Sequence, residues 1–425
     1  MKGDFPPLPR IIFVTRGEAN LDDVVVVGAG PAGNNAALSL ARNGFKVSVF
    51  DSRTEIGNKL CTGIIGTECA DKFPISESFV YSVPKLAELI TPDNGRLEFS
   101  VAHPQAKIVD RVSYVNSFAE LARAEGAKYH LGENVVDLKP HGYGVEVKTA
   151  YATYESKTVI IAAGFSSNLT QKVGLGRVSD YVTAVQAEVK TNIVAPTQVY
   201  LGDRIAPGFF GWVVPQTSDR SLVGILARTR SQFYMNGFLD KLKLDGIIEK
   251  ITKTPSKWGI PLRPLKDTVT DRILVVGDSA GQVKPTTGGG IYYSLVSSEI
   301  AADVLSKALI KSDFSKGYLH EYQQRWRELL SHELETGYAA RRMYEYLSDG
   351  QISSLARQAY KSGFVREILD SPKGSFDWHS GTIETFLTNP ISKSILGLVN
   401  PLFATFAKRP SFEDELISTT GGYLK

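Results

Sequence analysis

The stretch from Asp23 to Asp51 constrains the fold of this chain more than any other. Val24 to Val27 predict a strand buried on both faces, and glycines 28, 30 and 33 then form a G-x-G-x-x-G turn where a helix begins. In such a turn the glycines allow a tight bend, a close approach by a pyrophosphate and close helix-strand packing. Lys46 to Phe50 predict a second strand, and Asp51 follows at about the spacing expected for a carboxylate that binds ribose hydroxyls. A glycine-rich turn without a ligand is the alternative, but the full pattern predicts a dinucleotide site.

Length and composition set the broad class of the protein. A chain of 425 residues is expected to form about two to three domains. Its net charge of +3 and sequence pI of about 8.5 give no reason to expect a nucleic-acid partner. Two cysteines, Cys61 and Cys69, favour a reducing compartment without a disulfide framework, and the six histidines lack ligand spacing. We therefore predict a cytoplasmic protein with no structural metal.

The two ends of the chain carry weaker signals. Residues 1–20 contain three prolines and an apolar run of only four residues, Ile11 to Val14, which predicts a loose arm rather than a signal segment. No stretch reaches the roughly 18 uncharged apolar residues of a membrane span. Ser394 to Ala407 is apolar but is interrupted by Asn400 and Pro401. It could lie on a bilayer surface, although a pair of core helices is the interpretation we favour.

The middle of the chain alternates between strand and helix patterns. Residues 52–70 contain both cysteines and predict a long loop that returns toward the dinucleotide site. Short strands are expected at 96–101 and 106–109, followed by a helix over 113–125 with Ser113 as its N-cap and Gly126 as its stop. Further strands are expected at 135–138, 144–148 and 158–163.

A second domain is predicted from the pattern between residues 180 and 228. Four strand-like runs follow one another there, which predicts a mainly antiparallel sheet. Helical spacing returns at 233–244, and Arg272 to Val276 predict a strand that rejoins the first sheet. From Gly290 onward the pattern is helical, with 318–347 as the longest stretch. The first domain is therefore assembled from separated pieces.

A second glycine-rich segment, residues 277–295, follows this returning strand. Asp278 lies at the end of the strand, where a carboxylate suits a hydroxyl-bearing ligand, and glycines 288–290 open the next helix with free N–H groups. A turn at a domain junction would explain the glycines but not their combination with the first motif. We predict an anion site here.

With both segments in view, the chain resembles the flavoprotein superfamily of p-hydroxybenzoate hydroxylase, and within it the geranylgeranyl reductases, including the archaeal reductases of digeranylgeranylglycerophospholipids. The resemblance is carried by five segments: VVVVGAGPAGNNAALSLARNGFKVSVFD, EIGNKLCTG at 55–63, VDRVSYVNSFAELARAEGA at 109–127, FGWVVP at 210–215 and GDSAGQVKPTTGGGIYYSL. It implies an α/β fold in which a Rossmann-like FAD-binding domain carries an inserted antiparallel β-sheet substrate domain and a C-terminal helical region. The expected boundaries are 21–75, 105–180 and 265–310 for the FAD domain, 76–104 and 181–264 for the substrate domain, 311–425 for the helical region and 1–20 for the arm.

The resemblance also implies how FAD is bound. Asp51 is expected to bind the adenosine ribose, Asp278 the ribityl chain and the 28–33 turn the pyrophosphate. The backbone of 288–291 is expected to face the N1 and O2 edge of the flavin, where a helix N-terminus would stabilise the reduced ring. The full set of expected cofactor contacts is Gly28, Gly30, Pro31, Ala32, Gly33, Asp51, Ser52, Arg53, Cys61, Thr62, Gly63, Arg111, Ala163, Gly164, Gly277, Asp278, Gly288, Gly289, Gly290 and Ile291.

Cys61 occupies the position of the family's active-site cysteine. Reduction of an isolated double bond needs a hydride from the flavin and a proton on the other carbon, and a nearby thiol could donate or position that proton. Cysteine is also a common core residue, and we expect Cys69 to be one. The FGWVVP segment resembles a Y-x-W-x-F-P motif that lines a lipid cavity, with Phe210 and Val214 departing from it. Phe210, Trp212 and Pro215 are the expected substrate contacts, although each could be an ordinary core residue.

The leading hypothesis is an FAD-dependent reductase that saturates C=C bonds of a geranylgeranyl chain on a lipid or diphosphate, peripheral to a membrane. An Asp-Gly pair typical of the NADPH-using hydroxylases is replaced by Ala163-Gly164, which leaves NAD(P)H or ferredoxin open as the reductant. An aromatic hydroxylase or quinone-type oxidoreductase on the same scaffold is the second hypothesis. The third is an electron-transfer flavoprotein that resembles the FixC-like quinone oxidoreductases, although two cysteines cannot supply an internal iron-sulfur cluster.

Overall fold

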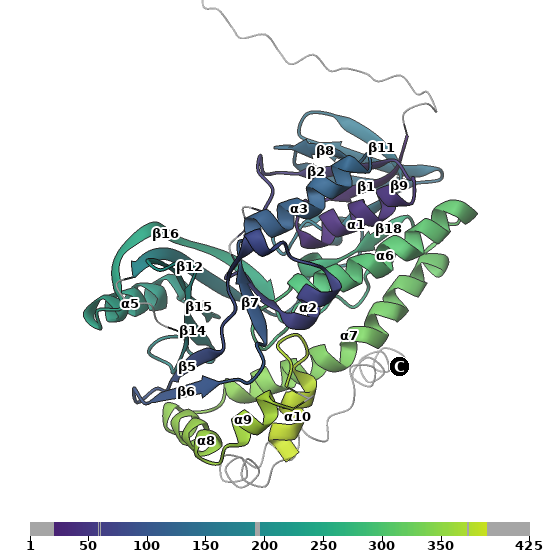
Figure 1. Cartoon of the computed structure of the whole chain (residues 1–425). Coiled ribbons are helices and arrows are strands. Elements are labelled where there is room, and N and C mark those ends of the chain that lie inside the picture. The colour runs from purple at the N-terminus through teal and green to yellow at the C-terminus, as the bar shows by residue number, and fades with distance from the viewer. Residues whose placement is uncertain (1–20, 58, 60, 192–195, 372–373, 389–425) are drawn as a thin grey trace, which may run out of the picture.

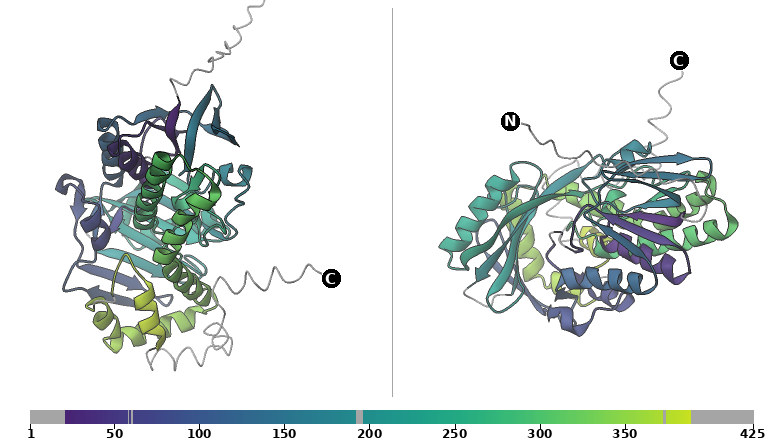
Figure 2. Two further views of the ribbon diagram at one scale, coloured as in Figure 1. Left: turned by 90° about the vertical axis from the view of Figure 1, so that its right-hand side faces the viewer. Right: turned by 90° about the horizontal axis from the view of Figure 1, so that it is seen from above.

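The computed structural model describes residues 21–57, 59, 61–191, 196–371 and 374–388. Two lobes, each built on a sheet, lie side by side, and two long helices run along one flank toward a group of short helices (Figure 1). A view from above shows the same two lobes (Figure 2). The arm at 1–20 and the apolar segment at 394–407 lie outside the described residues.

The first lobe is built on an eight-stranded sheet with a parallel centre. Its main path runs β17-β18-β11-β1-β2-β8, in which β1 pairs in parallel with β2 and β11. The strands on this path are β1 (Asp22–Val27), β2 (Val47–Asp51), β8 (Lys128–Leu131), β11 (Thr153–Ile161), β17 (Val269–Thr270) and β18 (Ile273–Val275). A hairpin of β9 (Val135–His141) and β10 (Gly144–Thr149) extends β11. The Rossmann-like α/β domain predicted from the sequence is confirmed.

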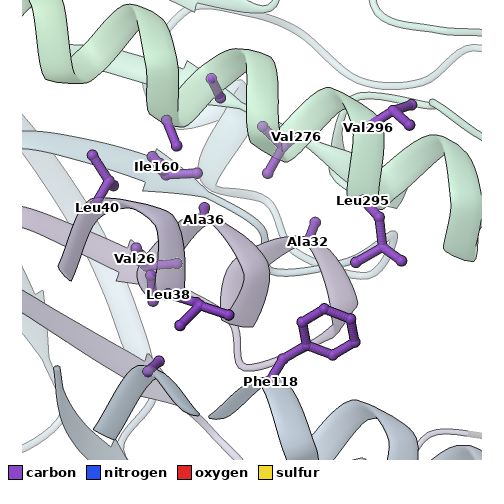
Figure 3. Close-up of a cluster of buried hydrophobic side chains, with 14 of the residues drawn as sticks. Val26, Ala32, Ala36, Leu38, Leu40, Phe118, Ile160, Val276, Leu295 and Val296 are labelled. Atoms are coloured by element: carbon purple, nitrogen blue, oxygen red, sulfur yellow. The ribbon is translucent and has the colours of Figure 1, made fainter. Parts of the chain in front are cut away.

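Three helices cover one face of this sheet, namely α1 (Pro31–Arg42), α3 (Arg111–Ala124) and α6 (Ile291–Lys311). Their buried apolar side chains form one core cluster with β1 and β11 (Figure 3). Small residues on α1, such as Ala32 and Ala36, face the aliphatic side chains of Leu295 and Val276 in this cluster. Because α1 carries so little side-chain bulk on this face, its first turn lies close to the sheet edge.

The second lobe is a seven-stranded sheet with the order β16-β12-β15-β14-β13-β5-β6. All neighbouring pairs are antiparallel except β13 with β5, so the predicted mainly antiparallel sheet is confirmed. Helix α5 (Ser231–Leu244) packs on one face. The strands are β5 (Leu86–Ile90), β6 (Arg96–Ser100), β12 (Tyr181–Thr191), β13 (Thr197–Leu201), β14 (Phe210–Pro215), β15 (Arg220–Ala227) and β16 (Ile248–Pro261).

A small sheet and the C-terminal helices join the lobes. The small sheet has the order β3-β7-β4, built from β3 (Ile64–Gly66), β4 (Val80–Ser82) and β7 (Ala106–Val109). The remaining helices are α2 (Thr67–Lys72), α4 (Leu169–Lys172), α7 (Lys316–Tyr344), α8 (Asp349–Lys361), α9 (Phe364–Leu369) and α10 (Ser380–Thr388), with short 3-10 turns η2 (Glu77–Phe79) and η3 (Gly277–Ser279). Among the described residues, no helix combines the length and the apolar character that a bilayer crossing requires.

Several predicted boundaries were wrong. The loop predicted over 52–70 ends earlier, because β3 and α2 form from residue 64 onward. Helix α3 begins at Arg111, and its N-cap is Asp110, whose carboxylate accepts a hydrogen bond from the Ser113 backbone N–H at 3.2 Å. The strand predicted over 158–163 runs from 153 to 161. Strands β5 and β16 were not predicted.

Candidate functional site

The first glycine turn leaves a helix N-terminus open at the edge of the first sheet. Gly28 has φ +110°, and a Cβ there would lie 2.3 Å from the Ala162 carbonyl oxygen. A Cβ on Gly33 would lie 1.8 Å from the Gly28 carbonyl oxygen, so the third glycine is required for the turn itself. Gly30 is the N-cap of α1, makes no side-chain cap, and has no atom within 4 Å of where its Cβ would be. The open side at Gly30 and the uncapped N–H groups together suit a phosphate.

Asp51 lies at the end of β2 and is held by two backbone amides. Its Oδ2 accepts from Ala29 N and its Oδ1 accepts from Arg53 N, each at 2.8 Å. The carboxylate therefore spans from its own strand to the glycine turn. Ser52 and Arg53, both exposed, continue this edge. A ribose beside the pyrophosphate would meet this carboxylate.

The second glycine segment meets the first. A Cβ on Gly277 would lie 3.2 Å from the Cβ of Ala32, so η3 and the start of α1 are in direct contact. Gly290 is the N-cap of α6 without a side-chain cap, and a Cβ there would lie 3.0 Å from the Asp278 Oδ1. The end of β11 joins the same place, because Ser279 donates to the Gly164 carbonyl at 2.9 Å. The uncapped N-termini of α1 and α6 and the carboxylates of Asp51 and Asp278 therefore border one region.

The cysteine loop, residues 55–63, is fastened to the second segment. Lys59 forms an ion pair with Asp278, and Arg111 donates hydrogen bonds to the carbonyls of Gly57 and Lys59. Arg111 is 7% exposed, and this burial lowers the pKa of its guanidinium, an effect that nearby Cys61 opposes. These contacts bring the loop, as expected, back to the second glycine segment, which itself meets the first.

Two glutamines of the second sheet hold the same loop from the opposite side. Gln186 Nε2 donates to the Cys61 carbonyl at 3.4 Å, and Gln216 Nε2 donates to the Thr62 carbonyl at 3.2 Å. Both glutamines are buried. Cys61 is half-buried, whereas Cys69 is buried in the core as predicted, and burial raises the pKa of the Cys69 thiol to about 12. Cys61 therefore lies in a loop held between the two lobes.

The face of the second sheet beside this loop carries Gln186, Gly224 and Trp212 in one register row. The indole of Trp212 lies over Gly224, where a Cβ would be 2.2 Å from the ring. Phe210 lies on the same face, with 6.0 Å between its ring centroid and that of Trp212. Trp212 Nε1 and Gln186 Oε1 are both buried and have no hydrogen-bond partner among the described residues. An unpaired donor and acceptor on an apolar wall indicate a ligand-facing surface.

The predicted substrate contacts do not all share that face. Gly211 packs against Phe238 of α5, so the alternation along β14 places position 211 with positions 213 and 215 on the α5 side. Pro215 therefore lies on the opposite face of the sheet from Trp212. The next residue, Gln216, reaches the cysteine loop instead.

Sequence reasoning missed Gln186, Gln216 and Lys59 as residues of this site. The two glutamines interrupt apolar strand patterns, YVTAVQAEV and GWVVPQ, and a polar residue at a buried strand position is a signal that could have found them. Lys59 carries no comparable signal. Within the described part of the chain, no group of three or more His, Cys, Asp or Glu side chains is arranged to hold a metal ion.

Comparisons with known proteins agree with this geometry. Residues 22–194 match the family model described as pyridine nucleotide-disulphide oxidoreductase. The chain is 30% identical over 379 residues to the digeranylgeranylglycerophospholipid reductase of Methanocaldococcus jannaschii, covering 82% of this chain and 94% of the relative. The enzyme of the same name from Methanococcus aeolicus is 30% identical over 79% of this chain and 89% of its own length. A geranylgeranyl bacteriochlorophyll reductase-like structure from Thermoplasma acidophilum shares the fold, with a TM-score of 0.77, 22% identity, and coverage of 90% of this chain and 100% of that one.

Proposed function

The chain belongs to the family of the digeranylgeranylglycerophospholipid reductases, which makes it an FAD-dependent oxidoreductase, and we propose that it saturates C=C bonds of a geranylgeranyl chain on a lipid or diphosphate. One observation carries the proposal for this chain. The cysteine loop is bound to Asp278 on one side and to Gln186 and Gln216 of the aromatic sheet face on the other. A thiol held between a cofactor site and an apolar sheet face is suitably placed to supply the proton that accompanies hydride transfer to a hydrocarbon chain.

The residues present fit FAD. The uncapped start of α1 and the open side of Gly30 would hold the pyrophosphate, and Asp51 the adenosine ribose. Asp278 would bind the ribityl chain, and the uncapped start of α6 would face the pyrimidine edge of the flavin. When bound and reduced, FAD supplies the hydride for the reaction.

The chain's own residues would prepare the site for that transfer. Trp212 and Phe210 would line the isoprenoid and exclude water, which limits loss of the hydride to side reactions. Cys61 would donate or position the proton that the second carbon needs, with Arg111 and the two glutamines fixing the loop that carries it. The adjacent rings of Phe210 and Trp212 give this face an apolar surface that suits a hydrocarbon chain.

The electron donor and the membrane contact form a separate part of the proposal. Because Ala163-Gly164 replaces the Asp-Gly pair of the NADPH-using hydroxylases, the chain lacks the aspartate carboxylate of that pair, which favours ferredoxin over a nicotinamide donor. A substrate with a geranylgeranyl chain resides in a bilayer, so we propose peripheral membrane association. Pull-down with ferredoxin and flotation with vesicles of the substrate lipid test the two points.

The activity is tested with purified, FAD-loaded protein reduced by dithionite under anaerobic conditions and given a digeranylgeranylglycerol lipid. The expected result is a mass gain of about 2 for each double bond reduced, detected by mass spectrometry. Cys61→Ala is expected to lose most of this activity while keeping FAD, and Cys69→Ala serves as the matched thiol control. Oxygen-dependent hydroxylation of a phenol, with no mass gain of the lipid, would contradict the proposal and favour the hydroxylase.

A further inference from the structure

One lysine of the second glycine segment, Lys284, is buried. Lys284 is 4% exposed and Asp377 is 2% exposed, although both carry ionisable side chains. The Lys284 Nζ lies 3.5 Å from the Asp377 Oδ1 and donates to the Phe376 carbonyl at 2.6 Å. The faces of Tyr293 and Phe376 lie 5.8 and 4.9 Å from the same nitrogen. A carboxylate, a carbonyl and two ring faces form the surroundings of an ammonium.

Asp377 is fixed by the segment that follows the cysteine loop. Its Oδ2 accepts from the Cys69 backbone N–H at 3.0 Å. The carboxylate lies against Gly66, where a Cβ would be 2.1 Å from an Asp377 oxygen, so a side chain at position 66 would displace it. The pair therefore joins residues of the C-terminal region to α2 and to the second glycine segment. A buried ion pair contributes little net stability to a fold. Selection for stability alone would therefore favour apolar residues at positions 284 and 377.

The ammonium is close to the glycines that open α6. Lys284 N donates to the Gly289 carbonyl at 3.1 Å, and Gly288 N donates to the Lys284 carbonyl at 2.9 Å. These two bonds close residues 284–289 into a turn. The Lys284 Cε lies 3.9 Å from where a Cβ of Gly289 would be. The Lys284 side chain therefore passes close to Gly289, and its ammonium lies one bond beyond this Cε.

A second buried anion, Glu333 of α7, belongs to the same cluster but has other partners. It accepts hydrogen bonds from His379 N at 2.7 Å and from Ser380 N at 3.0 Å, and from the Ser380 hydroxyl. The Tyr293 hydroxyl of α6 also donates to it at 3.4 Å, so its charge is shared among donors of the C-terminal region and α6. Asp377 is the carboxylate that lies within ion-pair distance of Lys284.

We propose that Lys284 sets the reduction potential of the bound FAD and that Asp377 offsets part of its effect. The inference rests on the proposed function for the placement of the flavin's N1 and O2 edge against residues 288–291. Reduction adds two electrons and one proton to the neutral ring, which leaves one negative charge at that edge. A cation close to Gly289 stabilises that charge in a site of low dielectric, and the neighbouring carboxylate destabilises it.

The test is the midpoint potential of the bound FAD, measured by anaerobic dye-linked titration. Lys284→Met is expected to lower the ratio of reduced to oxidised FAD about tenfold at a fixed solution potential, a shift of ~30 mV for a two-electron couple. Asp377→Asn is expected to shift the potential in the opposite direction, and Lys284→Arg to keep it near the wild-type value. The matched control is Asp303 with Lys307, a pair on α6 at 2.9 Å whose side chains are 45% and 47% exposed, for which Asp303→Asn and Lys307→Met should leave the potential unchanged.

Unchanged potentials in both Lys284→Met and Asp377→Asn, with FAD bound at the wild-type stoichiometry, would overturn the inference. Shifts of the same sign in both variants would also overturn it, because general loosening of the site would then be the cause. If Lys284→Met does not fold, Asp377→Asn decides the sign: a rise in the potential supports the inference, and an unchanged or lower potential overturns it. Opposite shifts in a protein that reduces no isoprenoid lipid would refute the proposed function alone.

Discussion

Lys59 and Asp278 form an ion pair across a sequence separation of 219 positions. Lys59 belongs to the cysteine loop, and Asp278 lies in η3 at the end of the returning strand β18. The pair is partly buried, with side-chain exposures of 32% and 17%. It therefore connects the loop that carries Cys61 to the second glycine segment, independently of the hydrogen bonds from Arg111.

Removal of this ion pair is expected to loosen the cysteine loop without unfolding the protein. A partly exposed ion pair contributes up to about 1 kcal/mol, which corresponds to an approximately fivefold increase in local opening. In Lys59→Met we expect backbone amides of residues 55–63 to exchange with deuterium about fivefold faster than in the wild type. Lys148→Met, at an exposed position of β10, is the control and should leave this exchange unchanged. Equal exchange in both variants would show that the other contacts suffice to hold the loop.

The glycines of the first turn are expected to separate folding from cofactor binding. A Cβ on Gly33 would lie 1.8 Å from a backbone carbonyl, so Gly33→Ala should displace the turn, lower the melting temperature of the FAD-free protein and abolish FAD binding. A Cβ on Gly30 meets no atom within 4 Å, so Gly30→Ala should change the FAD-free stability by less than about 1 kcal/mol. Its methyl group would occupy the approach to the pyrophosphate and weaken FAD binding more than about tenfold.

Calorimetry of the FAD-free proteins and fluorescence titration with FAD measure the two effects separately. Loss of stability in Gly30→Ala as large as in Gly33→Ala would mean that the second glycine serves the turn and not the ligand. Unchanged FAD affinity in Gly30→Ala would place the pyrophosphate elsewhere.

The fold could be predicted where local patterns coincide with tertiary roles. The valines of β1, the glycines that open α1 and the alternation of β12 to β15 are read from a few adjacent residues. Strand β16 was missed because it lies at the edge of its sheet, where its lysines and Pro255 are tolerated and hide the alternation. The N-cap of α3 was misplaced because Asp110 and Ser113 are both suitable caps, and only the backbone geometry decides between them.

The motifs of the site could be predicted from the sequence, but the residues that hold them in place could not. Each glycine segment is contiguous, so a role for it can be proposed from the sequence, whereas its contacts come from distant elements. Gln186 and Gln216 reach the cysteine loop from the second sheet, and Asp377 reaches Lys284 from beyond α9. Such pairings depend on how the lobes meet, which no local spacing encodes.

The two cysteines are expected to differ strongly in reactivity. Burial raises the pKa of the Cys69 thiol to about 12 from the ordinary value of 9.0, which makes it ~1000-fold less ionised at pH 8, and its side chain is also inaccessible. Iodoacetamide should therefore modify only Cys61 in the native protein and both cysteines in urea, as peptide mass spectrometry can show. Added FAD should slow the modification of Cys61, since the loop lies against the proposed flavin site. Rapid native modification of Cys69 would contradict its place in the core.

His379 is expected to make the stability of the protein depend on pH. Its Nδ1 lies 2.5 Å from the Thr286 hydroxyl, and its Nε2 donates to the Phe376 carbonyl at 3.0 Å, which places the hydrogen of the neutral ring on Nε2. Burial lowers the pKa of His379 to about 3, and the nearby Lys284 acts in the same direction. Between this value and the ordinary 6.5, the unfolded chain binds a proton that the folded chain does not.

The free energy of unfolding should therefore be highest above pH 6.5 and fall as the pH decreases toward 3. Each pH unit in this window changes the stability by about 1.4 kcal/mol, so this group alone should lower it by ~2 kcal/mol between pH 7 and pH 5. Urea titrations at several pH values measure the slope. His379→Gln should remove this part of the slope, whereas His332→Gln, at a side chain that is 67% exposed, should retain it. If His379→Gln keeps the wild-type slope, the imidazole takes up its proton without unfolding, and desolvation and the nearby Lys284 do not hold it neutral.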